Sequence, residues 1–201
     1  MPTIIKDTKK EFPKASEGQH VAICVDFIGP WRAVDDFDPK KPYLVQKCAY
    51  VWQIDEQRQD LKPFELAREF TMSFGPKANL RRFIGQWRGK EITDQEAKGQ
   101  GIDLEAFVGK PGLLTVQHRE KRAGGIRVEV SSIIPLPKQI GAISASAYTR
   151  AEYWAKRIAE DEDQATRLEQ EQMAAGAAQQ ERFQDIPAAL QEPESDSDLP
   201  F

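Results

Sequence analysis

The sequence has little of what disulfide frameworks, metal centres and membrane spans require. Its 201 residues include two cysteines, Cys24 and Cys48, which both lie in apolar, strand-like runs, so we expect buried, reduced thiols. The two histidines, His20 and His118, lack metal-ligand spacing, and we expect structural or surface imidazoles. No apolar run approaches the roughly 18 residues of a membrane span, and the first residues lack a signal-peptide core. These absences predict a soluble, cytoplasmic protein without membrane contact.

Catalytic motifs are absent as well. The chain contains no glycine-rich phosphate loop, Gly-x-Ser-x-Gly elbow, His-Glu-x-x-His or Cys-x-x-Cys sequence. Asp35, Asp36 and Asp38 lie close together and could bind Mg²⁺ as in a nuclease, but three acids in a polar loop are usually solvated. We therefore expect a protein that is not an enzyme and has no cofactor or metal, with a Mg²⁺-dependent nuclease as the less favoured alternative.

Charge is divided unevenly along the chain. Residues 1–149 contain 23 Lys and Arg against 19 Asp and Glu, which gives +4, whereas residues 150–201 contain 5 against 13, which gives −8. A basic body attracts phosphate backbones. An acidic segment tethered to it is expected to compete for the same surface.

Five stretches have the apolar alternation and the β-branched and aromatic content of strands. Gly29-Pro30 should end the first of them, and a polar loop should follow to residue 42. Between the last two, Glu120–Gly125 should form a turn, because two glycines permit the positive φ that hairpin turns require. The expected strands are 20–28, 43–54, 66–74, 113–119 and 126–134.

The hydrophobic period changes between the third and fourth strands. Leu80, Ile84 and Trp87 recur at the spacing of one helix face, which predicts an amphipathic helix over 77–88 that Gly89 ends. Thr93, with Glu96 three residues later, is a candidate helix cap. A short helical piece is expected over 102–108.

The two ends of the chain are polar. Residues 1–17 are expected to form a flexible basic arm, and 139–149 a linker of small residues. A helix is predicted over 150–172, with only a thin apolar stripe at Trp154, Ile158, Ala165 and Leu168. It could pack on the body, on a second subunit in a homo-oligomer, or on nothing. Residues 173–201 are expected to form a disordered acidic tail.

The tail tip, residues 192–201 (EPESDSDLPF), combines four acids with an apolar end. A carboxylate beside a Phe ring suits a small apolar pocket rimmed by Arg or Lys on another protein. This tip resembles the C-terminal tip of bacterial and phage single-stranded DNA-binding proteins. The resemblance implies a partner-docking segment of Asp196, Asp198, Leu199, Pro200 and Phe201, read by replication or recombination proteins. An ordinary solubilising tail is the alternative.

The order of three strands, a helix and two strands is that of the five-stranded OB-fold barrel, although other small α+β domains can be drawn from the same elements. We therefore expect a mainly β protein whose residues 18–138 form an OB-fold nucleic-acid-binding domain with a helix between strands 3 and 4. The segment Leu80–Gly89 (LRRFIGQWRG) also resembles a Leu-Arg and Trp-Arg-Gly signature in small phage replication proteins of this kind.

A single-strand binder needs cations that follow the phosphates and rings that stack on bases. Trp31 lies in the expected polar loop, where stacking is favoured because little core is available to it. The face that carries Tyr50 and Trp52 could equally be the core face. For the arginines of the expected helix, a solvated basic face is the alternative. The expected DNA-binding residues are Trp31, Arg32, Lys47, Tyr50, Trp52, Arg68, Arg81, Arg82, Arg88, Arg119, Lys121, Arg122 and Arg127.

Body and tip together predict a single-stranded DNA-binding protein that coats DNA during phage replication, recombination or repair and recruits enzymes through its tip. An OB-fold interaction or regulatory protein of such a complex is the alternative.

Removal of Phe201 should leave the affinity for oligo-dT little changed while abolishing recruitment of the replication partner, because the ring is expected to dock on another protein. Titration of tryptophan fluorescence with oligo-dT and a binding assay with purified replication proteins measure the two effects. Undiminished recruitment would contradict the docking role.

Overall fold

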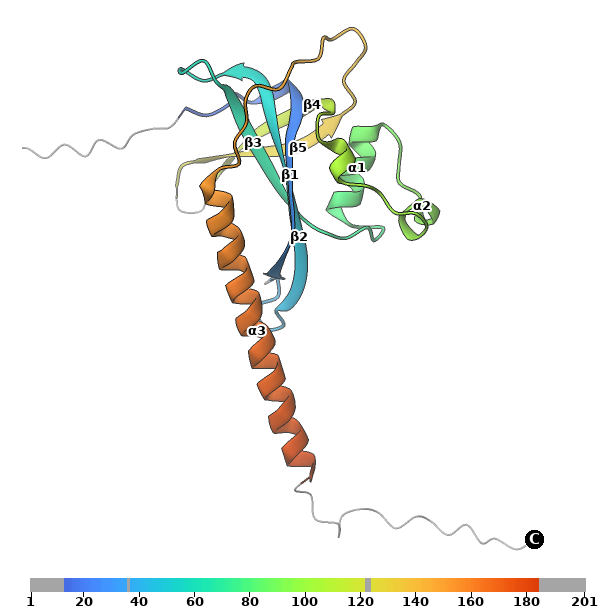
Figure 1. Ribbon diagram of the computed structural model, residues 1–201, viewed down its shortest axis with the longest axis vertical. Helices are drawn as coiled ribbons and strands as arrows, with labels where there is room; N and C mark the ends of the chain where they lie inside the picture. Colours follow the sequence, from blue (N-terminus) through green and yellow to red (C-terminus); the bar gives the residue numbers. More distant parts are fainter. Residues whose placement is uncertain (1–12, 36, 122–123, 185–201) are drawn as a thin grey trace, which may run out of the picture.

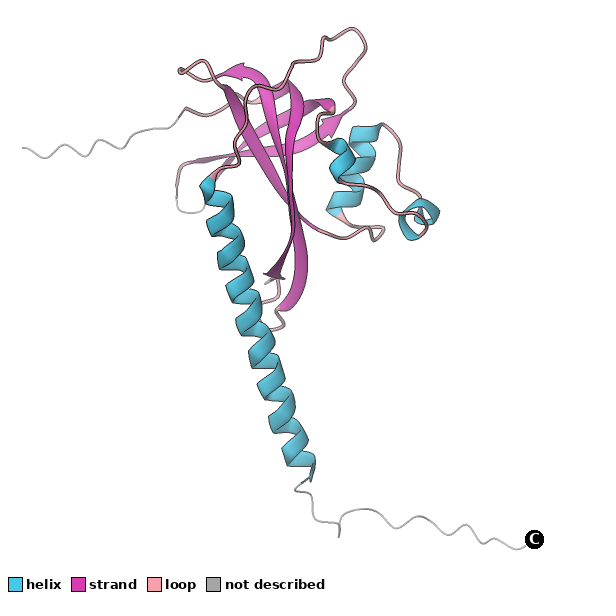
Figure 2. Ribbon diagram, viewed as in Figure 1, coloured by secondary structure: helices cyan, strands magenta, loops and turns pink. Residues whose placement is uncertain are grey.

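A five-stranded antiparallel sheet forms the centre of the protein (Figures 1 and 2). The computed structural model describes residues 13–35, 37–121 and 124–184. The strands lie in the order β3-β2-β1-β4-β5, so β3 and β5 are the two edges. Their bounds are β1 Gly18–Asp35, β2 Tyr43–Gln57, β3 Pro63–Thr71, β4 Pro111–Glu120 and β5 Ile126–Ile134.

The first strand is longer than the sequence predicts. Gly29-Pro30 was expected to end it, but β1 continues to Asp35 and pairs with β2 from Trp31 opposite Lys47 onward. The register shifts between Ile28 and Trp31, so the proline, which has no N–H to donate, falls outside the regular ladder. The first part of the expected polar loop, up to Asp35, is therefore strand, and β1 and β2 form a long hairpin (Figure 1).

Three short helical segments, α1 Asn79–Arg88, α2 Asp94–Lys98 and η1 Glu105–Phe107, connect β3 to β4. The predicted helix face is confirmed, because Leu80, Ile84 and Trp87 are buried. Gly89 ends α1 with a φ of 64°. Thr93 caps α2 by accepting the backbone N–H of Glu96 at 3.1 Å.

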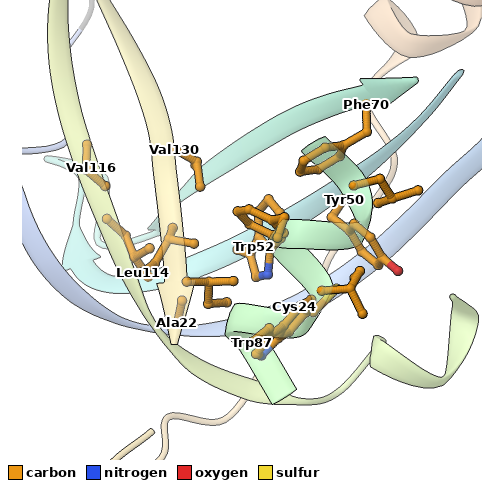
Figure 3. Packing of buried hydrophobic residues seen from close by; sticks show 14 of the residues in the cluster. Ala22, Cys24, Tyr50, Trp52, Phe70, Trp87, Leu114, Val116 and Val130 are labelled. Carbon is orange, nitrogen blue, oxygen red and sulfur yellow. The ribbon is translucent and has the colours of Figure 1, made fainter. Parts of the chain in front are cut away.

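The main core lies between α1 and one face of the sheet (Figure 3). Aromatic rings dominate it, and Trp52 contacts both Phe83 and Trp87 with ring centroids 5.7 and 5.8 Å apart. Cys24 and Cys48 are buried and unpaired as expected. Burial raises the pKa of each thiol to about 12, so neither is reactive at neutral pH.

The long helix α3, Glu152–Gln184, packs on the opposite face of the sheet. It runs alongside the β1–β2 hairpin and beyond it (Figure 1). Trp154 and Ala165 are buried against the strands, with Ile158 half-buried between them. The helix continues past residue 172, where the acidic tail was expected to start, because Ala, Gln and Glu are strong helix formers.

The segments that flank the sheet are tied to it. Arg150 donates two hydrogen bonds of 2.8 Å to Asp26, and Tyr148 donates a third of 2.9 Å. Ala15 is buried, and Ser16 donates to Glu56 at 2.8 Å. Residues 13–17 therefore pack on the sheet instead of belonging to a flexible arm. Residues 1–12 lie outside the described part of the chain. No helix that the structure describes is long and apolar enough to cross a membrane.

Gly112 of β4 tests how closely the core is packed. A Cβ at this position would lie 2.6 Å from Cδ1 of Ile133 and 3.0 Å from Nε1 of Trp87. Overpacking of this kind costs about 1–3 kcal/mol, so Gly112→Ala should lower the free energy of unfolding in urea by about that amount. The matched control is Gly141→Ala, whose Cβ would meet no described atom within 4 Å. Equal stability of the two variants would contradict the packing.

Candidate nucleic-acid interface

Arginines from five elements of the fold line one hollow on the protein surface. The hollow has a volume of about 650 Å³ and lies where β3, α1, the β4–β5 hairpin and the first turns of α3 meet. We call it the arginine hollow. Its charged lining comprises five arginines and two glutamates: Arg68, Arg82, Arg119, Arg127, Arg157, Glu69 and Glu129.

The β4–β5 hairpin supplies the most exposed cations. Arg119 and Arg127 lie opposite each other in the ladder, and their side chains are about two-thirds exposed. Both contact Glu129, with N–O distances of 3.0 and 3.3 Å. One carboxylate is therefore shared between two guanidiniums, which leaves an excess positive charge at the mouth of the arginine hollow.

Arg68 forms the floor of the hollow and bridges the two edges of the sheet. It projects from β3, and its Nη1 donates to the carbonyl oxygens of Val130 and Ser131 on β5, at 2.9 and 2.7 Å. Its guanidinium also lies 5.0 Å from the ring centroids of Phe70 and Phe83. Burial lowers the pKa of Arg68 below its usual value, and nearby arginine charges lower it further. A bound anion would relieve that repulsion.

Arg82 and Arg157 line the remaining sides. Arg82 of α1 is exposed and donates to the side chain of Asn79 at 2.9 Å. Arg157 of α3 lies 3.6 Å from Glu69 and donates to Asp161 at 2.6 Å. Burial alone would lower the pKa of Arg157, but these two carboxylates raise it above its usual value. Arg157 therefore stays cationic at neutral pH.

Three of the expected DNA-binding residues contact α3. Trp31 was expected in a polar loop, but it is buried, and its Nε1 donates to Asp161 at 2.9 Å. Lys47 lies 3.8 Å from the same carboxylate, and Arg32 pairs with Glu169 at 3.2 Å. The expected loop is a strand whose outer face carries a helix, so Trp31 is buried and Lys47 is partly buried beneath it, whereas the side chain of Arg32 remains 46 % exposed.

Tyr50 and Trp52 lie in the main core with no exposed surface. The hydroxyl of Tyr50 donates to the carbonyl of Leu104 at 2.8 Å. The sequence did not decide whether the face of β2 that carries these two rings belongs to the core, and in the structure α1 covers that face. Neither ring presents a surface on which a base could stack in this fold.

Two arginines of α1, Arg81 and Arg88, hold α2 in place. Arg81 donates to the carbonyls of Ile92 and Phe74 and pairs with Asp94 at 2.6 Å, which holds the pKa of that carboxyl below its usual range. Arg88 pairs with Glu96 at 2.7 Å. Both side chains are bonded within the fold, so neither belongs to the solvated basic face that was the alternative to phosphate contact.

The remaining expected residues are at the hairpin turn and in the tail. Lys121 is exposed beside the turn, where Gly124 and Gly125 have the expected positive φ. Arg122 lies outside the described residues, as do all members of the tail tip: Asp196, Asp198, Leu199, Pro200 and Phe201.

Two lining residues, Tyr153 and Arg157, were missed by the sequence reasoning. The sequence feature that could have indicated them is their position close to Trp154, the first residue of the thin apolar stripe. The stripe shows that the helix can dock, but not on which surface. Their part in the arginine hollow follows from the docking of α3 on β1 and β2.

The structure offers no metal centre in the part of the chain that it describes. His20 lies 3.3 Å from Asp55 and 3.0 Å from the carbonyl of Ser16, and His118 lies 2.8 Å from the carbonyl of Ala15. Both imidazoles hold the N-terminal segment against the sheet. Asp36, one of the three acids considered for Mg²⁺, lies outside the described residues.

Comparisons of the chain with protein-family models, with curated proteins and with solved structures found no match.

The buried carboxylate of Asp161 should control the docking of α3. Asp161→Ala leaves the Trp31 N–H without an acceptor, which costs about 1–3 kcal/mol, and we expect faster hydrogen exchange along the docked half of α3. The control is Asp163→Ala, because Asp163 is exposed and pairs only with Arg167 among the described residues. The two changes alter helix propensity equally. Identical exchange rates in the two variants would contradict the role of Asp161.

Proposed function

We propose that this protein binds single-stranded DNA and that the arginine hollow contacts the phosphates. The observation that carries the proposal is the convergence of five arginines against two glutamates on one open hollow. Cations gathered from separate elements suit a polyanion that passes over several of them. The acidic tail tip, which resembles that of single-stranded DNA-binding proteins, supports an unpaired strand as the ligand.

The body is then a barrel of the OB type. The strand order supports this, because β1 pairs with both β2 and β4 while β3 and β5 lie at the edges. The position of α1 between β3 and β4 in the chain also agrees. The two hydrogen bonds from Arg68 to the carbonyls of β5 draw the edges towards each other.

The exposed ion pairs of the hairpin can exchange their partner for phosphate. Solvent-exposed pairs such as Arg119–Glu129 and Arg127–Glu129 contribute only about 0–1 kcal/mol, and bidentate guanidinium–phosphate contacts can replace them. Arg82, which has only the neutral Asn79 as a described side-chain partner, has no ion pair to give up. Arg68 remains bound to β5 and acts through its charge.

The tail tip then recruits the proteins that act on the coated strand in replication, recombination or repair. Its acids precede the apolar residues Leu199, Pro200 and Phe201, a composition that suits an apolar pocket with a cationic rim. The acidic tail also competes with DNA for the arginine hollow when salt is low.

Removing two arginines from the hollow should weaken binding in a salt-dependent way. The slope of log K against log salt concentration is negative, and each lost phosphate contact reduces its magnitude by about 0.7 for a single strand. The double variant Arg82→Gln, Arg127→Gln should therefore make this slope shallower by about 1.4 in an oligo-dT titration followed by fluorescence anisotropy.

A control double variant removes the same charge elsewhere. Arg58→Gln with Arg167→Gln alters two exposed, ion-paired arginines that do not line the hollow. Its slope should stay close to that of the unmodified chain. An equal loss in both variants would reject the hollow as the site, and no salt-sensitive binding of oligo-dT by the unmodified chain would reject the proposed function.

A further inference from the structure

An exposed aromatic ring lies in the wall of the arginine hollow. Tyr153, in the first turn of α3, lines the hollow and is 57 % exposed. One side of its ring is backed by Trp154, with ring centroids 5.0 Å apart, and Trp154 in turn packs on Trp31 at 6.2 Å. Three aromatic side chains thus run from the sheet outward, and the outermost reaches solvent among cations.

The position of this ring is set by the body of the protein. Arg150, three residues before Tyr153, is tied to Asp26 by two hydrogen bonds of 2.8 Å. Beyond the ring, Asp161 accepts the Trp31 N–H at 2.9 Å. A ring held in place on both sides loses little conformational entropy when a ligand packs against it.

The chemistry of this wall fits a nucleotide better than a polyanion without bases. Tyr153 and Arg157 lie one helical turn apart and both line the hollow, so an aromatic surface and a cation are presented together. A sulfated or phosphorylated polymer would use only the arginines. The ring contributes binding free energy only when the ligand has a flat π-face on which it can stack. In a duplex these faces are already covered by the neighbouring bases.

We propose that Tyr153 stacks on an unpaired base of the strand whose phosphates the arginines contact. The inference rests on the proposed function and extends it. It makes α3, which lies outside the five-stranded body, part of the binding surface. The ligand is then selected by its bases as well as by its charge.

The test compares two probes of equal length and charge, oligo-dT and a fully abasic oligonucleotide, on the full chain. Tyr153→Ala should weaken binding of oligo-dT by about 5- to 150-fold, the range measured for the loss of one base stack. Its affinity for the abasic strand should equal that of the unmodified chain. Tyr153→Phe keeps the ring and should bind both probes as the unmodified chain does.

Tyr153→Leu separates stacking from packing on Trp154. Leucine retains apolar contact with the neighbouring ring but offers no π-face, so it should lose oligo-dT affinity as alanine does. Recovery of affinity with leucine, or an equal loss for both probes, would overturn the stacking role, as would unchanged binding of oligo-dT by Tyr153→Ala. Failure of the unmodified chain to bind either probe would instead reject the proposed function itself.

Discussion

The carboxylate of Asp161 is the interaction on which the outer layer of this protein depends. It is 4 % exposed and accepts hydrogen bonds from Trp31 on the sheet and from Arg157 on its own helix, with Lys47 close by. A buried charge is stable only when it is paired and hydrogen-bonded. Because its partners lie on both the sheet and α3, satisfying the charge also positions the helix.

The docking of α3 explains why β1 and β2 are apolar on both faces. One face of the sheet carries the main core beneath α1, and the other carries Trp31, Ala33 and Val51 beneath α3. The second layer belongs to the chain itself, and the arginines that we propose to contact DNA lie at the edge of the sheet, where β3 and the β4–β5 hairpin meet the start of α3.

The arginine hollow therefore depends on long-range packing, although most of its cations were foreseen. Arg68, Arg82, Arg119 and Arg127 were all expected to contact DNA, and the structure brings them to one surface. Trp31, Arg32 and Lys47, which were expected with them, instead contact α3, and of these three only Arg32 stays exposed. An acidic helix therefore lies on a surface of aromatic and cationic side chains.

The sequence by itself determined the elements and their order. The period of Leu80, Ile84 and Trp87, the cap at Thr93 and the glycines of the β4–β5 turn are local signals, because they act through neighbouring backbone and side chains. Only the tertiary structure decided which layer covers each face. A strand with apolar residues on both sides does not indicate locally which face the core covers, so Tyr50 and Trp52 could not be assigned to the core. For the same reason Trp31 could not be assigned to the surface on which α3 docks. The Trp31–Asp161 hydrogen bond joins residues 130 positions apart, and such contacts placed Tyr153 and Arg157 in the hollow.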